Sequence, residues 1–199
     1  MDGRTARAAR NRQAVLDAVL ALTEEGNLQP TARAVAERAG VATRSVFHHF
    51  TDLESLYADA AQTQIERHWV RLLRPVTGDP GQRIQTLVEL RAELYERISG
   101  TRRAAVLREH ESAVLAERLH ESRVALRAHL RVNLPELERL DRPVREAAYA
   151  AATWETWDVL RRHQGLSAAA ARAAVGATLT ALLAPAPTVI DGNRKFRAE

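Results

Sequence analysis

Cysteine is absent from this 199-residue chain, and lysine is nearly absent. Without a thiol, the chain has no disulfide framework, no thiolate zinc site and no cysteine nucleophile, which fits a reducing compartment. Of its 29 basic residues only Lys195 is a lysine, so arginine supplies almost all of the positive charge. The 25 acidic residues leave a net charge of +4 at pH 7, which is by itself weak evidence for a nucleic-acid partner.

Long apolar runs are also lacking. The first apolar stretch, residues 18–22, is too short for the core of a secretory signal. The uncharged run over residues 173–190 is interrupted by Gly176, Pro185 and Pro187, which favours a buried helix followed by a turn over a membrane span. We therefore expect a cytoplasmic protein of one domain or two small ones.

The basic residues are unevenly placed. Arg4, Arg7, Arg10 and Arg12 fall within the first fifteen residues, where only Asp2 opposes them. An arginine-rich arm suits contact with phosphates, and a solvated, frayed terminus is the alternative interpretation.

Apolar residues recur at helical spacing throughout the chain, and no segment shows the alternation of a strand, so the sequence predicts an all-α fold. Helices are expected over 4–25, 31–39, 43–49, 51–74, 82–98, 102–110, 113–133, 143–164 and 168–184. The breaks include Gly26, Gly40, Gly100 and Pro135. We expect an N-terminal domain over 1–50, a helical body over 51–184 and a tail over 185–199.

Residues 31–49 have the pattern of a helix-turn-helix, in which two short helices are joined by a turn at Gly40. Thr31 is predicted to cap the first of them, and Thr43 the second, because Ala42 has no hydroxyl. Thr51 and Glu54 have the spacing of a capping box for the next helix, and Ser167 is placed to cap the last one.

A set of residues at fixed spacing extends from residue 12 to residue 58. It comprises Val15, Leu16, Ala18, Gly26, Thr31, Arg33, Val35, Ala36, Ala39, Gly40, Val41, the run Val46-Phe47-His48-His49-Phe50, Glu54, Leu56 and Ala58. In these positions the chain resembles the N-terminal domain of the tetracycline-repressor (TetR) family of transcriptional regulators. Trp154, Trp157 and Leu160, followed by residues 165–167, give the C-terminal half a coarser likeness to the same family.

The resemblance implies a DNA-binding helix over residues 43–49. Arg44 is the side chain expected to read a base, because a guanidinium can bond both O6 and N7 of guanine. Phe47 stands where the family commonly has a phosphate-binding tyrosine, and Leu53 where it commonly has a lysine, so two phosphate contacts are missing. Phe47 is either a core aromatic or a DNA contact, and His48 faces either the groove or solvent. The full set of expected DNA-binding residues is Arg4, Arg7, Arg10, Thr31, Arg33, Thr43, Arg44, Ser45, Phe47 and His48.

The last two predicted helices are rich in alanine, which lets helices approach closely. We expect them to form a four-helix bundle with a second copy, although packing within one chain is the alternative. Such a dimer would set two DNA-binding helices ~34 to 36 Å apart, which predicts a pseudo-palindromic operator.

An effector pocket is expected between the DNA-binding domain and the dimer helices, although most of its candidate residues must be ordinary core. The candidates are Leu90, Leu94, Tyr95, Leu107, His110, Tyr149, Trp154 and Trp157. Aromatic walls with a few polar groups favour a small apolar or aromatic effector. No cofactor or metal is expected.

The sequence thus predicts a repressor that a small effector releases from DNA, and not an enzyme. A regulator that activates, or that has no effector, is the main alternative. A helical metalloenzyme is a remote one, because the Glu-x-x-His spacing of a di-metal site occurs once, at Glu117 and His120, where two copies are needed.

Overall fold

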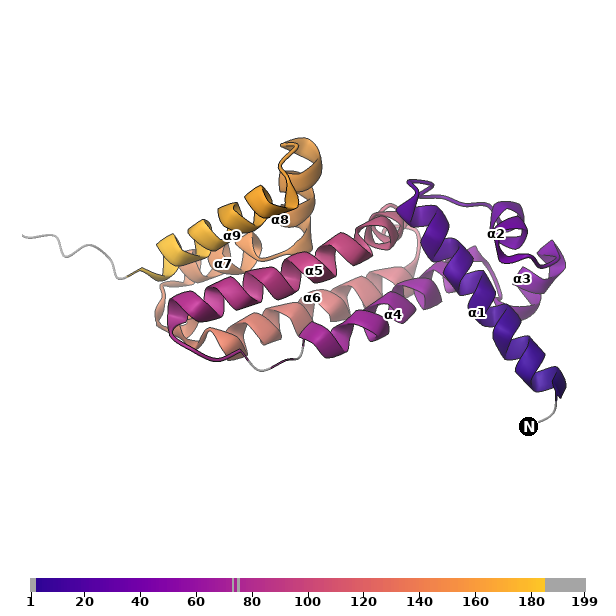
Figure 1. Cartoon of the computed structure of the whole chain (residues 1–199), viewed down its shortest axis with the longest axis horizontal. Coiled ribbons are helices and arrows are strands. Elements are labelled where there is room, and N and C mark those ends of the chain that lie inside the picture. The colour runs from indigo at the N-terminus through magenta and orange to yellow at the C-terminus, as the bar shows by residue number, and fades with distance from the viewer. Residues whose placement is uncertain (1–2, 73, 75, 185–199) are drawn as a thin grey trace, which may run out of the picture.

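A computed structural model describes residues 3–72, 74 and 76–184 of the chain. All regular elements among these residues are helical, which confirms the predicted all-α class (Figure 1). The molecule is elongated, with α1, α2 and α3 forming a head at one end and the remaining helices forming a body. The tail predicted over 185–199 lies outside the described residues. No helix in the described part of the chain is long and apolar enough to cross a bilayer.

The head consists of α1 (Gly3–Glu24), α2 (Ala32–Ala39) and α3 (Thr43–His49). Its core is formed by apolar side chains from all three helices and from the start of the body, among them Val15, Val19, Val35, Val46 and Leu56. Gly40 ends α2 with φ of 67°, a left-handed conformation that glycine adopts without strain. The predicted turn of the helix-turn-helix is therefore present.

Helix caps in the head agree with the predictions at one position and differ at two. The Thr31 hydroxyl accepts a hydrogen bond from the Ala34 amide, as predicted. Thr43 is not a cap, because α3 begins at that residue and Ala42 precedes it without a side-chain bond.

The capping box predicted at Thr51 and Glu54 is also wrong. Asp52 and Ser55 form the reciprocal pair instead, since the Asp52 carboxylate accepts from the Ser55 amide at 2.7 Å and the Ser55 hydroxyl accepts from the Asp52 amide at 3.3 Å.

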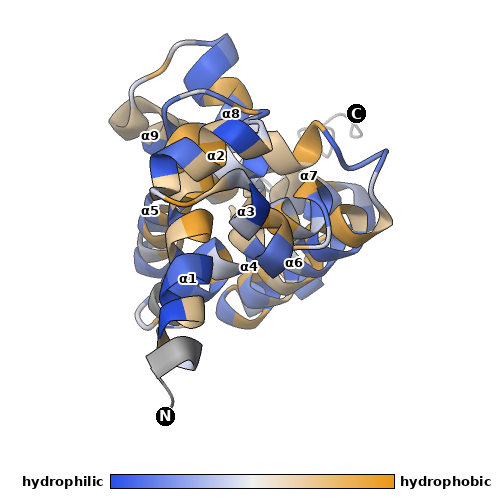
Figure 2. Ribbon diagram, turned by 90° about the vertical axis from the view of Figure 1, so that its right-hand side faces the viewer, coloured by the Kyte–Doolittle hydropathy of each residue, from blue (hydrophilic) through white to orange (hydrophobic). Residues whose placement is uncertain are grey.

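The body contains three long helices that run lengthwise and a group of shorter ones that covers one side of them (Figure 1). The long helices are α4 (Leu53–Leu72), α5 (Pro80–Val106) and α6 (Ala113–Asn133). The shorter elements are the 3-10 turn η1 (Pro135–Arg139), α7 (Arg142–Ala151), α8 (Trp154–Asp158), the π-helical turn η2 (Val159–His163) and α9 (Ala168–Leu183). Figure 2, which views the molecule from the head end, shows apolar stretches alternating with polar ones along these helices.

Two predicted boundaries in the body are wrong. The segments expected over 82–98 and 102–110 form one helix, α5, because Gly100 lies inside it and does not end it. The segment expected over 143–164 is divided, since Thr153 caps a new helix with its hydroxyl and so separates α8 from α7.

Gly100 lies where the body meets the head. A Cβ added at this residue would lie 2.6 Å from the carbonyl oxygen of Thr23, closer than real contacts allow. The adjacent Thr101 hydroxyl is 3.3 Å from the Thr23 hydroxyl, and both side chains are buried. Glycine is therefore required for the close approach of α5 to the end of α1.

Candidate nucleic-acid interface

Helix α3 is anchored on one side and open on the other. Val46 is buried within the head, and Phe50, 3% exposed, follows the helix with the Arg12 guanidinium 5.1 Å from its ring centre. Thr43, Arg44 and His48 are exposed on the outer side. Phe47 is 50% exposed, so it is a surface aromatic and not part of the core.

The structure brings the N-terminal half of α1 next to α3. Arg7 and Asn11 of α1 line one side of a surface hollow of about 410 Å³, and Arg44, Ser45 and His48 of α3 line the other. The arginine-rich segment is therefore helical and extends the surface of α3. Asn11 was not among the residues expected from sequence, although its position one helical turn after Arg7 places both side chains on the same face.

Ion pairing separates the arginines of the head into two groups. Arg33 is bound to Glu37 at 2.8 Å and Arg38 is bound to Glu25, and in each pair both side chains are exposed. Within the described residues, Arg7, Arg10 and Arg44 have no acidic partner. The side chain of Arg4 lies outside the described residues. The unpaired guanidiniums are the ones available to an anion without the loss of an existing ion pair.

Thr31 and Arg33 lie together at the start of α2, on the exposed surface. The hydrogen bond from Arg33 to Glu37 raises the pKa of this guanidinium, which stays charged. Because Arg33 is held by Glu37 and the Thr31 hydroxyl by the Ala34 amide, a phosphate here would meet groups that already have partners.

His49 lies at the end of α3 beside His48. Their rings meet edge to face with centres 5.3 Å apart. Burial lowers the pKa of His49, and electrostatic repulsion from His48 and Arg12 lowers it further, so the neutral form of this imidazole is favoured. The positive charge of the surface therefore rests mainly on Arg7, Arg10 and Arg44.

An exposed short helix, a glycine turn before it and unpaired arginines beside it define a helix-turn-helix DNA-binding domain, here carried on a helical body. Residues 15–60 match the family model described as bacterial regulatory proteins, tetR family. These residues therefore form the N-terminal DNA-binding domain that characterises this family of transcriptional regulators.

Solved structures of transcriptional regulators share the fold of most of this chain. A transcriptional regulator from Rhodococcus sp. Rha1 is similar with a TM-score of 0.71 at 20% identity, over 86% of this chain and 95% of the other. A tetR-family regulator from Streptomyces coelicolor is similar with a TM-score of 0.69 at 17% identity, over 92% of this chain and 82% of the other. No curated protein matches the sequence significantly.

The body contains a cavity of about 640 Å³ between α6 and α7–α8, with α5 at its base. Two of the predicted effector residues, Tyr149 and Trp154, line it. Leu90, Leu94, Tyr95 and Trp157 instead belong to the packed core of the body, and Leu107 and His110 are exposed near the end of α5. The structure therefore brings together only part of the predicted set.

Four arginines in the cavity wall were not among the expected residues. They are Arg91 and Arg102 on α5 and Arg123 and Arg127 on α6. A signal for two of them is present in the sequence, because Arg91 and Arg102 fall on the same helical stripe as the buried Leu87, Leu94 and Ile98. A charged residue at an apolar position of a helix is a better indicator of a site than another leucine.

The metalloenzyme alternative gains no support from the geometry. Glu117 and His120 are both exposed on α6. Within the described residues, no three histidine, aspartate or glutamate side chains are grouped so that they could hold a metal ion.

Proposed function

We propose that this regulator is a cytoplasmic repressor that binds a pseudo-palindromic operator as a homodimer, and that a small molecule in the body cavity releases it. The observation that carries the proposal is the convergence of the unpaired Arg7 and Arg44 on one exposed surface. This function requires no catalysis, cofactor or metal.

Each side chain of the surface has a role that follows from its position. Arg44, near the start of α3, reads a guanine in the major groove, with Thr43, Ser45 and His48 beside it as further donors. Phe47 packs against sugar or a thymine methyl group, since it is exposed and has no hydroxyl. Arg7 and Arg10, which are unpaired among the described residues, contact phosphates. Thr31 and Arg33 do so only by exchanging their bonds to Ala34 and Glu37 for a phosphate. Arg4, whose side chain lies outside the described residues, is kept as a phosphate contact on its sequence position alone.

The dimer forms through α7–α9. Helix α9 buries Ala171, Val175 and Leu179 within its own chain. Its other side exposes a row of small side chains, among them Ala173, Ala177 and Ala181. A second copy related by a two-fold axis covers this row and sets the two α3 helices one turn of DNA apart.

The test is a fluorescence anisotropy titration with labelled DNA taken from genome-wide binding sites of the protein, compared with random DNA at several salt concentrations. We expect tight, salt-sensitive binding to a palindrome. Equal affinity for random DNA contradicts a specific repressor.

The Ala177→Glu variant tests the dimer in the same experiment. The exposed position tolerates the change within one protomer, whereas a charge in a dimer interface gives a monomer with weaker DNA binding. Val132→Glu, at a 74% exposed position of α6, is the control and should leave both mass and binding unchanged. A dimeric Ala177→Glu protein with full affinity contradicts this interface.

A further inference from the structure

Charges around the body cavity do not balance. Four arginines lie in its wall, together with Glu146 and Glu155. Glu109 lies behind the wall and binds Arg123. Four guanidinium groups against three carboxylates leave one positive charge in excess.

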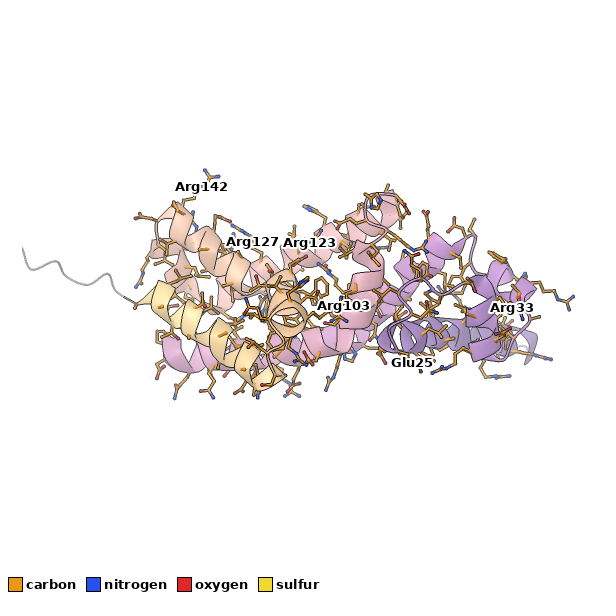
Figure 3. The ribbon with its side chains drawn as sticks, turned by 90° about the horizontal axis from the view of Figure 1, so that it is seen from above. Glu25, Arg33, Arg103, Arg123, Arg127 and Arg142 are labelled. Atoms are coloured by element: carbon orange, nitrogen blue, oxygen red, sulfur yellow. The ribbon has the colours of Figure 1, made fainter. Side chains whose placement is uncertain are left out.

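Two of the arginines are fully paired. Arg127 makes two contacts to Glu146, at 2.6 and 2.7 Å, and its guanidinium lies 3.7 Å from the ring centre of Tyr149. Arg123 makes two contacts to Glu109, at 2.6 and 3.1 Å. In Figure 3 these arginines lie next to each other along α6, whereas Arg142 projects outward from the start of α7.

The excess charge belongs to the other two, Arg91 and Arg102. Arg91 donates to Tyr95 Oη and to the carbonyl oxygens of Ala152 and Leu126, all of which are neutral. Arg102 donates to Ser122 Oγ at 2.6 Å. Its one carboxylate contact, to Glu155, is 3.4 Å long, and the same oxygen is bound more closely by Arg123, at 3.1 Å.

Both of these side chains are buried. Arg91 is 4% exposed and Arg102 is 6% exposed, and the Nε of each has no hydrogen-bond partner among the described residues. Burial lowers the pKa of Arg102, and the nearby charge of Glu155 opposes that effect only in part. A buried cation without a matched anion is costly, so this wall favours a ligand that brings one negative charge.

Beside these arginines the wall is mainly apolar and aromatic. Trp154 lies under Arg102, with 5.7 Å between the guanidinium and the ring centre. Leu126, Leu130 and Tyr149 add further apolar and aromatic surface, and Thr153 and Thr156 add two hydroxyl groups. The cavity volume, about 640 Å³, lies within the range of small-molecule sites, roughly 300–1,000 Å³.

We propose that the effector is an organic carboxylate with an aromatic or aliphatic body, bound with its carboxylate at Arg91 and Arg102 and its body against Trp154 and Tyr149. This inference rests on the proposed function and adds a negative charge to the small apolar or aromatic effector predicted from sequence. A carboxylate fits because a planar anion with two oxygens matches the fork of a guanidinium.

Arg102 also connects the cavity to the helix that leads to the head. It lines a second, smaller hollow together with Gln64 and Ile65 of α4. Gln64 is buried and donates to Glu24 at the end of α1, at 3.4 Å. A carboxylate that draws Arg102 toward the cavity therefore alters the packing of α4 and α1, and so the placement of α3 on DNA.

The experiment compares acids with their neutral amides: naphthoate with naphthamide, phenylacetate with phenylacetamide, and decanoate with decanamide. Thermal shift measures binding to the full chain, and anisotropy measures release of labelled operator DNA. We expect at least one acid to bind about tenfold or more tightly than its amide and to release DNA.

Arg102→Gln should weaken the binding of that acid about tenfold or more and leave the binding of its amide unchanged. Arg142→Gln removes a positive charge outside the cavity and should change the affinity for neither compound. Arg102→Lys keeps the charge, retains part of the acid's affinity, and serves if the glutamine variant does not fold.

The assignment is overturned if no acid exceeds its amide, or if Arg102→Gln and Arg142→Gln affect the acid equally. Absence of operator binding in the protein without any acid would instead contradict the proposed function. Intact operator binding with no acid-specific effect contradicts the carboxylate alone.

Discussion

In the head, Arg7 and Arg44 are exposed and have no acidic partner among the described residues. In the body, Arg91 and Arg102 are almost fully buried. The hydrogen-bond partners of Arg91 are all neutral, and Arg102 has one long carboxylate contact, to Glu155. The exposed pair costs little to keep unpaired, because water solvates it until a phosphate arrives. Arg91 and Arg102 have lost that solvation on burial, so the positive charge that no carboxylate balances destabilises the fold. The same residue type therefore serves a large anion at one end and, in our proposal, a small one at the other.

Gly100→Val acts where the two regions meet, and we expect the largest effect there. Its Cβ would press against the Thr23 carbonyl, and overpacking of this kind costs about 3 kcal/mol of unfolding free energy at the upper end of its usual range. Gly100→Ala should cost less, because the gain of about 1 kcal/mol in helix propensity offsets part of the clash.

Arg97→Val is the control for Gly100→Val. It places the same residue on an exposed part of α5, where the effect should stay within about 0.5 kcal/mol. Urea unfolding measures all three variants. If Gly100→Val were as stable as the control, the close contact between α5 and α1 would not exist.

Arg44→Ala and Arg7→Ala divide the functions within the head. Arg44→Ala should cost about 1 to 3 kcal/mol at one base pair and relax the preference there, whereas Arg7→Ala should weaken binding to every sequence alike and reduce its salt dependence. Anisotropy with single-base operator variants measures both. Arg38→Ala, which removes an arginine held by Glu25, should leave DNA binding nearly unchanged. A uniform loss for Arg44→Ala would make it a phosphate contact instead.

Arg91→Met tests whether the buried charge is kept for binding or for stability. The Ala152 carbonyl still accepts from Tyr95 after the change, so this acceptor keeps a partner while the desolvated charge disappears. We expect the variant to be more stable by about 1 kcal/mol, the low end of what such replacements give, and to lose the response to acids.

Arg10→Met, at an exposed position of the head, is the matched control for Arg91→Met and should change stability by less than about 0.5 kcal/mol. Thermal and urea unfolding without ligand measure the difference. A marked loss of stability in Arg91→Met would show that its three hydrogen bonds outweigh its desolvation.

The head could be predicted from sequence because its signals are local. Gly40 ends α2 and Thr31 caps it, each through neighbours within five residues. The exceptions are two caps. Helix α3 begins at Thr43 without a side-chain cap, and at α4 the cap is Asp52, one residue after the predicted Thr51. A carboxylate is a strong cap, and the pattern alone did not show which residue would be used.

The site in the body could not be predicted in the same way, because its contacts join distant residues. Arg91 meets the carbonyl of Ala152, and Arg102 meets Glu155, across more than fifty positions of sequence. The sequence predicts a helix break at Gly100, because the contact that requires this glycine is to the backbone of Thr23, which is equally remote in the sequence. Periodicity identifies which side chains face inward, but the pairing of inward charges is decided by tertiary packing.

The smallest effect we predict concerns acid. The hydrogen bond from Arg123 holds the pKa of Glu109 below its usual value of 4.5, although burial opposes this shift. A carboxyl whose pKa is lower in the folded state stabilises the protein above about pH 4.5, and this contribution is lost as the pH falls through the folded pKa. Glu109→Gln should therefore reduce the fall in stability between about pH 6 and pH 3 by less than about 1 kcal/mol, because the pair is partly exposed.

Glu117→Gln, at an exposed position of α6, should leave the pH profile unchanged, and urea unfolding across this range measures both. A steeper profile in Glu109→Gln would mean that Arg123 does not favour the charged form of Glu109.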